Sequence, residues 1–187
     1  MKKNGGAVLA LYPTPLVVVG AMKDAKPTWT LVAHVGIIGH DRVLVSLASS
    51  HYINGIIKEG RKLSLNIVDV SYLPQADYLG SVSGFKEDKS GVFEYETGVA
   101  GTPVIKKAPL TMECTVVDIY NSKGFESFIC TIDSTLVEED CLNEEGRMDY
   151  RRLKPVLFEF PTYEYLETGD VLGKCLSFKK DRERHME

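Results

Sequence analysis

Hydroxyl, imidazole and amide side chains gather in one short segment, residues 46–54, where a strand-like run gives way to a helical pattern. Backbone N–H groups at the start of a helix lack partners and carry partial positive charge, so such a position suits a phosphate. Ser49, Ser50 and Asn54 can add neutral hydrogen bonds, and His51 can add a donor or a charge. An ordinary serine cap with a solvated His51 is the alternative, and the spacing leaves both interpretations open.

A second segment, residues 77–89, combines glycine, serine and lysine. Its two glycines and two serines either bring the backbone close to a ligand or simply turn the chain. Lys86 and Lys89 could neutralise an anion, or they could be solvated on a surface loop. The segment is not a phosphate-binding P-loop, because the GxxxxGK[ST] pattern is absent.

The single tryptophan of the chain, Trp29, lies in a third segment, residues 27–34, between Thr28 and Thr30. An aromatic wall beside hydrogen-bonding groups fits a planar ligand, although a lone tryptophan is also common in a protein core. The segment is therefore a candidate surface for an aromatic molecule, with the core as the alternative.

Metal-dependent and nucleophilic chemistry have little support in the sequence. His34, His40 and His51 show no HxH or HExxH spacing, and no carboxylate pattern completes a metal site. The GxSxG motif of one class of serine hydrolases is absent. No two cysteines form a CxxC pair, and we interpret all four as small buried hydrophobic residues: Cys114, Cys130, Cys141 and Cys175.

The composition is that of an ordinary globular protein, with 187 residues, 44% of them hydrophobic and 26% charged. A net charge of −4 gives no basic surface for nucleic acid. No apolar run approaches the roughly 20 residues that span a bilayer, so we expect no membrane association. The apolar stretch at residues 7–11 is too short for a signal peptide, and the expected location is the cytoplasm.

Short strand-like runs dominate the chain, and helical patterns are scarce. Strands are expected at residues 16–19, 43–47, 62–67, 93–96, 113–120, 128–137 and 156–160, with a hairpin turn at 121–124. Helices are expected from a Ser50 cap through residue 59, from residue 71 or 74 to 79, and over 144–153, and the tail from about 179 is charged. This pattern favours one antiparallel barrel or sandwich over a βαβ fold.

Taken in chain order, these segments resemble the flavin reductase-like domain of flavoredoxins, an FMN-binding split barrel. The order of the segments carries the resemblance, which covers nearly the whole chain. The matching residues are 12–20, 26–36, 45–52, 65–67, 77–89, 108–118, 153–155, 163–166 and 172–173. The resemblance implies a mainly β fold, a six-stranded antiparallel Greek-key barrel with a few short helices, as a single domain over residues 1–187.

The resemblance also implies an FMN site at the interface of a homodimer. The strand that lines the isoalloxazine ring matches Thr28, Trp29, Thr30 and Leu31, and a second strand residue facing the flavin matches Asn66. The loop and helix start around the ribityl phosphate match Ser46, Ala48, Ser49, Ser50, His51 and Asn54. The second loop matches Gly80, Ser83, Gly84 and the phosphate ligand Lys89, and approaching aromatics match Tyr163 and Tyr165.

In such a protein the chemistry belongs to the flavin, so no nucleophile or acid–base dyad is expected from the chain. Non-covalent FMN accepts a hydride from NADH or NADPH and reduces free flavin, a ferric chelate or a redox partner protein. A flavin-binding carrier or sensor without nicotinamide turnover is one alternative. A cofactor-free interaction domain is another, because Leu31, Ile53 and Phe85 replace polar or charged residues of the family and His51 replaces a frequent arginine.

Overall fold

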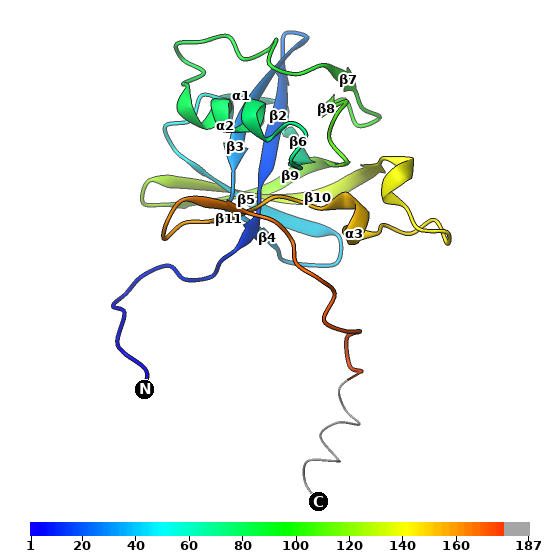
Figure 1. Cartoon of the computed structure of the whole chain (residues 1–187). Helices are drawn as coiled ribbons and strands as arrows, with labels where there is room; N and C mark the ends of the chain where they lie inside the picture. The colour runs from blue at the N-terminus through cyan, green and yellow to red at the C-terminus, as the bar shows by residue number, and fades with distance from the viewer. Residues whose placement is uncertain (178–187) are drawn as a thin grey trace, which may run out of the picture.

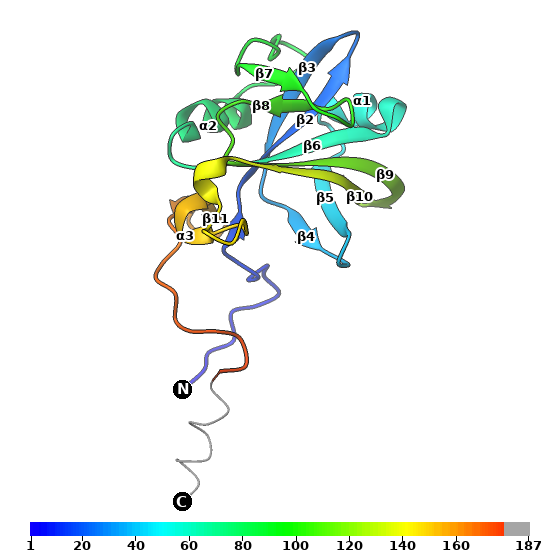
Figure 2. The ribbon, with the colours of Figure 1, turned by 90° about the vertical axis from the view of Figure 1, so that its right-hand side faces the viewer.

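The computed structural model describes residues 1–177, and the charged tail predicted from about 179 lies outside the described residues. Seven antiparallel strands form one curled sheet in the order β3-β2-β6-β9-β10-β5-β4 (Figures 1 and 2). Their bounds are β2 Val17–Lys23, β3 Lys26–Val32, β4 Val35–Ile37, β5 Arg42–Ala48, β6 Lys62–Ile67, β9 Leu110–Ser122 and β10 Phe125–Val137. The expected split barrel is confirmed, and β4 is a short edge strand beside the six longer ones.

The core inside the curled sheet follows the predicted alternation. Leu63, Leu65 and Ile67 of β6 face it, and helix α1 (Ile53–Gly60) closes it with its apolar face. The polar residues between them, Ser64 and Asn66, are fully buried rather than solvent-facing. They are buried because a second layer covers the outer face of β6, so both faces of this strand are internal.

That second layer contains a short sheet and a helix. Strand β7 (Tyr95–Thr97) pairs with β8 (Pro103–Ile105), and α2 (Leu73–Ser81) packs beside β3. Buried polar contacts hold it in place: Ser64 Oγ donates to Pro103 O, and Glu113 accepts from Ala100 N and Thr102 Oγ1, both at 2.9 Å. The strand predicted at 93–96 begins two residues later and ends one residue later in the structure, as β7, and β8 was not predicted.

A third sheet joins the two ends of the domain. Strand β1 (Thr14–Pro15) pairs with β11 (Leu157–Glu159), which pairs with β12 (Glu164–Leu166). The chain before β1 and the chain after β12 leave the barrel on the same side (Figures 1 and 2). The β11–β12 hairpin, near the C-terminal end of the domain, therefore lies beside β1, the first strand of the chain.

The helices differ from the prediction at their starts. α1 begins at Ile53, and its cap position is Tyr52, without a side-chain cap bond, so Ser50 is not the cap. α2 begins at Leu73 with a proline in its first turn, a position that needs no N–H donor. The third helix is only α3 (Tyr150–Leu153), capped by the Asp149 side chain, after a short 3₁₀ turn η1 (Glu139–Cys141).

Three cysteines, Cys114, Cys130 and Cys141, are buried as predicted, but Cys175 is exposed, and so are all the described residues from 171 onward. Within residues 1–177, no cluster of three or more potential metal ligands occurs. None of the helices in this range has the length and apolar character needed to cross a membrane.

Candidate functional site

Two adjoining cavities form a continuous cleft between β3, the turn before α1, the end of α2 and the loop that follows it. We call the first, of about 450 Å³, the polar cavity, and the second, of about 640 Å³, the aromatic cavity. Leu31, His51, Gly80 and Ser81 line both of them. A ligand with two chemically different ends can therefore occupy the cleft.

The polar cavity brings together residues from all three segments that the sequence singled out. The predicted site residues on its wall are Thr28, Trp29, Thr30, Leu31, Ser50, His51, Gly80, Ser83, Gly84 and Lys89. Five residues of this wall were not predicted: Tyr52 and Ile53, which follow His51 directly, and Leu79, Ser81 and Val82 at the end of α2 and just after it. Ile53 turns most of its side chain into the barrel core, where it is 2% exposed.

The aromatic cavity contains four further predicted residues, Ser46, Ala48, Tyr163 and Tyr165. Three phenylalanines also lie on its wall: Phe125, Phe158 and Phe160. Phe160 contacts Tyr163 with ring centroids 4.9 Å apart. Sequence reasoning missed the three phenylalanines, because the chain brings them together from β10 and the β11–β12 hairpin without any local motif.

A hydrogen bond between two residues that line the aromatic cavity joins β12 to α2. Tyr165 Oη on β12 donates to Asp77 Oδ1 on α2 at 2.5 Å. Burial and the neighbouring carboxylate raise the pKa of Tyr165 to about 12, so the hydroxyl keeps its proton near neutral pH. This bond holds the hairpin against the helix that carries Gly80.

Three predicted site residues lie elsewhere. Asn66 is the clearest departure: its amide donates to Val18 O and Ser64 Oγ, and accepts from Ile105 N and Thr111 Oγ1. Asn66 was expected to face the flavin. Because its amide makes all of these bonds inside the protein, it does not line the cleft. The amide anchors the second layer to the sheet.

Asn54 and Ser49 support the loop before α1 without lining either cavity. Asn54 Nδ2 donates to Ala48 O at 3.1 Å and to Glu126 Oε2 at 2.7 Å. Ser49 N donates to Gly124 O at 3.0 Å, so the β9–β10 turn also holds this loop. These two residues position the wall of the cleft, whereas the prediction placed them in contact with the ligand.

Lys89 and His51 give the polar cavity its charge. Lys89 is 5% exposed, and its ammonium donates to Leu79 O at 3.0 Å, which leaves two of its three donors for a ligand. Burial lowers the pKa of Lys89. Burial, and secondarily the charge of Lys89, lowers the pKa of His51, so an anion in this cavity would favour the charged form of both groups.

The lowered pKa of His51 predicts how the flavin-free protein responds to acid. The unfolded chain, with an ordinary histidine pKa of 6.5, takes up a proton before the folded one does, so stability is lost as pH falls below about 6.5. We expect the melting temperature to decrease between about pH 7 and pH 5 in wild type. His51→Gln should flatten this decrease, and an equally steep decrease in that variant would contradict the assignment.

Comparisons with known proteins agree with the fold and the cleft. The model of the flavin reductase-like domain family matches residues 9–166, and the chain belongs to this family. A comparison with curated proteins gives no significant match.

Solved structures of flavoredoxins are similar along almost their whole length. The flavoredoxin of Methanosarcina acetivorans is 30% identical, with a TM-score of 0.90, over 96% of this chain and 98% of that one. The flavoredoxin of Desulfovibrio vulgaris (Miyazaki F) is 31% identical, with a TM-score of 0.87, over 95% and 98%. The FMN-binding protein of Thermus thermophilus shares the fold at 18% identity and a TM-score of 0.77, over 93% and 99%. The chain thus has the fold of the flavoredoxins within this family.

Proposed function

We propose that the protein binds FMN without a covalent bond, with the phosphate in the polar cavity and the ring system in the aromatic cavity. This arrangement differs from the one that the resemblance implies, because Thr28, Trp29 and Thr30 line the polar cavity, and Ser46 and Ala48 line the aromatic one. The observation that carries this proposal is Lys89, a buried cation at one end of a cleft whose other end is aromatic, with the half-buried His51 where the two cavities meet. A phosphate and a planar ring at opposite ends of one ligand match these two environments.

The residues of the cleft fit such a ligand. Trp29 Nε1 and His51 Nδ1 are buried and have no hydrogen-bond partner among the described residues. A buried donor without a partner costs free energy, which a polar ligand in the cavity would recover. Gly84 lies so close to Tyr52 that a Cβ there would be 3.0 Å from the tyrosine side chain, so the glycine keeps the wall compact.

FMN supplies hydride and single-electron transfer when bound, and the chain supplies position and electrostatics. Lys89 and the polar groups around it hold the phosphate, and Ser50 and Ser83 add neutral donors. The aromatic side chains exclude water from the ring end of the cleft. We propose NADH or NADPH as the reductant, and free flavin, a ferric chelate or a redox partner protein as the acceptor.

We further propose that two copies of the chain form a homodimer through the rim of the aromatic cavity. Three aromatic residues that line that cavity are exposed: Tyr163 at 68%, Phe160 at 37% and Phe125 at 36%. Exposed apolar side chains of this kind mark protein interfaces.

The four cysteines are unpaired, as is usual in a reducing compartment, and we propose the cytoplasm as the location.

Purification tests the flavin and its reduction separately. We expect a yellow protein, or an apoprotein whose melting temperature rises with added FMN, because a ligand of the native state must stabilise it. Its absorbance near about 450 nm should bleach on anaerobic mixing with NADH or NADPH. Rapid bleaching supports a reductase, bound flavin that resists both nucleotides supports a carrier, and no response to FMN would refute the proposal.

A further inference from the structure

The wall of the aromatic cavity contains a histidine to which the flavin proposal assigns no task. His34, between β3 and β4, lies beside two phenylalanines of that wall: its ring centroid is 5.7 Å from that of Phe125 and 5.5 Å from that of Phe160. We call His34, Phe125 and Phe160 the histidine corner. None of the three lines the polar cavity, so the corner belongs to the ring end of the cleft and not to the phosphate end.

Tyr12 lies behind this histidine. Its Oη is 3.4 Å from His34 Nε2, and its ring stacks on Phe160 with centroids 5.9 Å apart. Burial, and secondarily the neighbouring Tyr163, raises the pKa of Tyr12, so the hydroxyl keeps its proton near neutral pH. It can donate that proton to Nε2, which places the proton of a neutral imidazole on Nδ1. Within residues 1–177, His34 Nδ1 has no hydrogen-bond partner of its own.

Other polar groups on the wall of the aromatic cavity already have partners inside the protein. Asp77 accepts the bond from β12, and Ser81 Oγ donates to a backbone carbonyl of α2 at 2.7 Å. Ser46 Oγ shares a hydrogen bond of 2.9 Å with Ser127 Oγ. His34 differs from them, because it keeps a donor for a ligand in a corner whose other walls are apolar rings.

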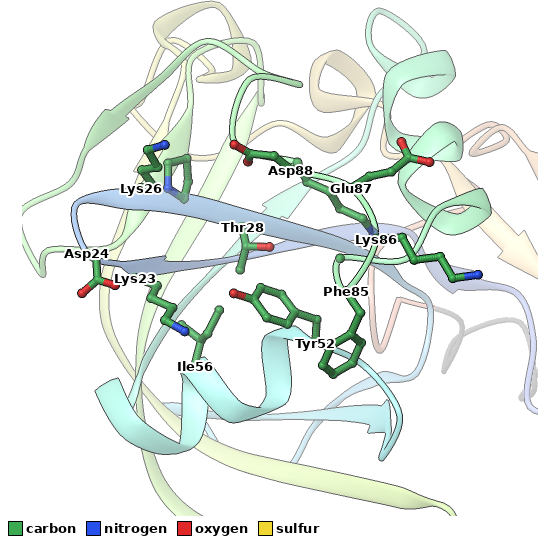
Figure 3. A pocket seen from close by; sticks show the side chains of 13 residues that line it. Lys23, Asp24, Lys26, Thr28, Tyr52, Ile56, Phe85, Lys86, Glu87 and Asp88 are labelled. Atoms are coloured by element: carbon green, nitrogen blue, oxygen red, sulfur yellow. The ribbon is translucent and has the colours of Figure 1, made fainter.

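A further cavity, of about 400 Å³, adjoins the opposite end of the cleft (Figure 3). It shares wall residues with the polar cavity and none with the aromatic cavity. Figure 3 shows charged side chains around it, among them Lys23, Asp24 and Asp88. A molecule bound there would be separated from the flavin ring by the phosphate, so the histidine corner is the better place for an electron acceptor.

We propose that the histidine corner binds a quinone, and that His34 protonates this acceptor during its two-electron reduction. The inference rests on the proposed flavin function and adds a further class of acceptor to it. A quinone is a flat conjugated ring with two carbonyl oxygens, which matches two aromatic side chains beside one N–H donor. A ferric chelate or a one-electron redox protein needs no proton at this position, so the pair of His34 and Tyr12 favours the quinone.

The reaction balances with the groups that the corner contains. Reduced FMN supplies a hydride, which carries a proton and an electron pair. The hydride forms an O–H bond at one quinone oxygen, and an electron pair of the conjugated ring moves to the other oxygen. That oxygen takes the proton of His34 Nδ1, Nε2 takes the proton of Tyr12, and Tyr12 regains one from water. Hydroquinone and tyrosine are both phenols, so the proton passes between groups of similar acidity, as general acid catalysis requires.

Anaerobic stopped-flow mixing of the FMN-loaded protein, photoreduced in advance so that no nicotinamide is needed, tests the proton transfer. Duroquinone is the two-electron acceptor, and ferricyanide takes single electrons without a proton. His34→Gln should slow the reaction with duroquinone roughly 100-fold more than the reaction with ferricyanide, the scale of one general acid. His40→Gln is the matched control, because His40 is exposed and lines none of these cavities.

Tyr12 acts through His34, so its test needs a measurement that a purely structural role would not satisfy. Tyr12→Phe keeps the ring that stacks on Phe160 and removes the hydroxyl. It should slow the reaction with duroquinone about tenfold relative to ferricyanide. Calorimetric titration of the oxidised, FMN-loaded protein with hydroquinone measures binding without turnover, and the affinity of Tyr12→Phe should equal that of wild type. Phe160→Leu should weaken this binding roughly tenfold, because a stacking surface is lost.

The outcomes separate this inference from the function on which it rests. A protein that takes up no FMN fails the proposed function first, and the inference with it. A flavin-loaded protein that does not bind hydroquinone overturns the quinone site and leaves the flavin proposal intact. Equal slowing of both acceptors in His34→Gln, or duroquinone reduction at the wild-type rate in Tyr12→Phe, overturns the proton transfer.

Discussion

Replacing Lys89 with methionine is expected to weaken FMN binding by roughly 10- to 100-fold, the scale of one lost charge-assisted hydrogen bond. Lys89 is the buried cation of the polar cavity, and two of its donors are free for a phosphate. Methionine has a similar length without the charge, so the packing beside Leu79 should survive. Fluorescence titration of the apoprotein with FMN measures the change directly.

The stability of the Lys89→Met protein should change much less than its affinity for FMN. Methionine removes a buried ammonium group, whose burial is unfavourable, and also the single bond to Leu79 O, so the two effects oppose each other. We expect the melting temperature of the apoprotein to change little. Lys107→Met is the control, since Lys107 is an exposed lysine outside the cleft. A Lys89→Met protein that binds FMN like wild type would place the phosphate elsewhere.

The barrel strands were predictable because alternation along a strand records which face is buried. The hairpin of β9 and β10 was found from two long runs rich in β-branched residues around a turn. The second layer was predicted only in part: α2 and a strand overlapping β7 were expected, but β8 and its pairing with β7 were not, because these strands are three residues long and their place depends on distant polar partners. Asn66 illustrates this: its neighbours in the sequence indicate one apolar face, yet its partners come from β2, β8 and β9.

The residues of the candidate site also fall into two groups: those that lie close together in the sequence were predicted, and most of those that only the fold brings together were not. The loops around His51 and Lys89 were predicted, because phosphate-binding residue types cluster within short segments of the sequence. The aromatic cavity was missed for the most part, since Phe125 and Phe160 are 35 residues apart along the chain and meet only through the fold. Asn54 has a residue type that suits the ligand, but the fold uses its amide to hold Ala48 and Glu126 together.

Gly20 connects the core of the barrel to the wall of the cleft. It pairs with Trp29 across β2 and β3, and a Cβ at this position would lie 2.4 Å from Trp29 Cζ3 and 2.7 Å from Ser64 Oγ. Neither neighbour can easily move. The Trp29 ring packs edge to face against Phe93 with centroids 5.6 Å apart, and Ser64 Oγ donates to the backbone of β8. A methyl group therefore has to displace the tryptophan or separate the two layers.

We expect Gly20→Ala to reduce the free energy of unfolding by about 2–3 kcal/mol, as overpacking of a rigid core does. For a domain of this size the melting temperature should fall by roughly 5–10 °C. FMN affinity should fall as well, because Trp29 is part of the polar cavity. Gly36→Ala is the matched control: Gly36 lies on β4, and a Cβ there would have no heavy atom within 4 Å, apart from its chain neighbours. If Gly20→Ala and Gly36→Ala melt at the same temperature, Trp29 is not fixed by the core, and the wall of the cleft is more adaptable than this packing implies.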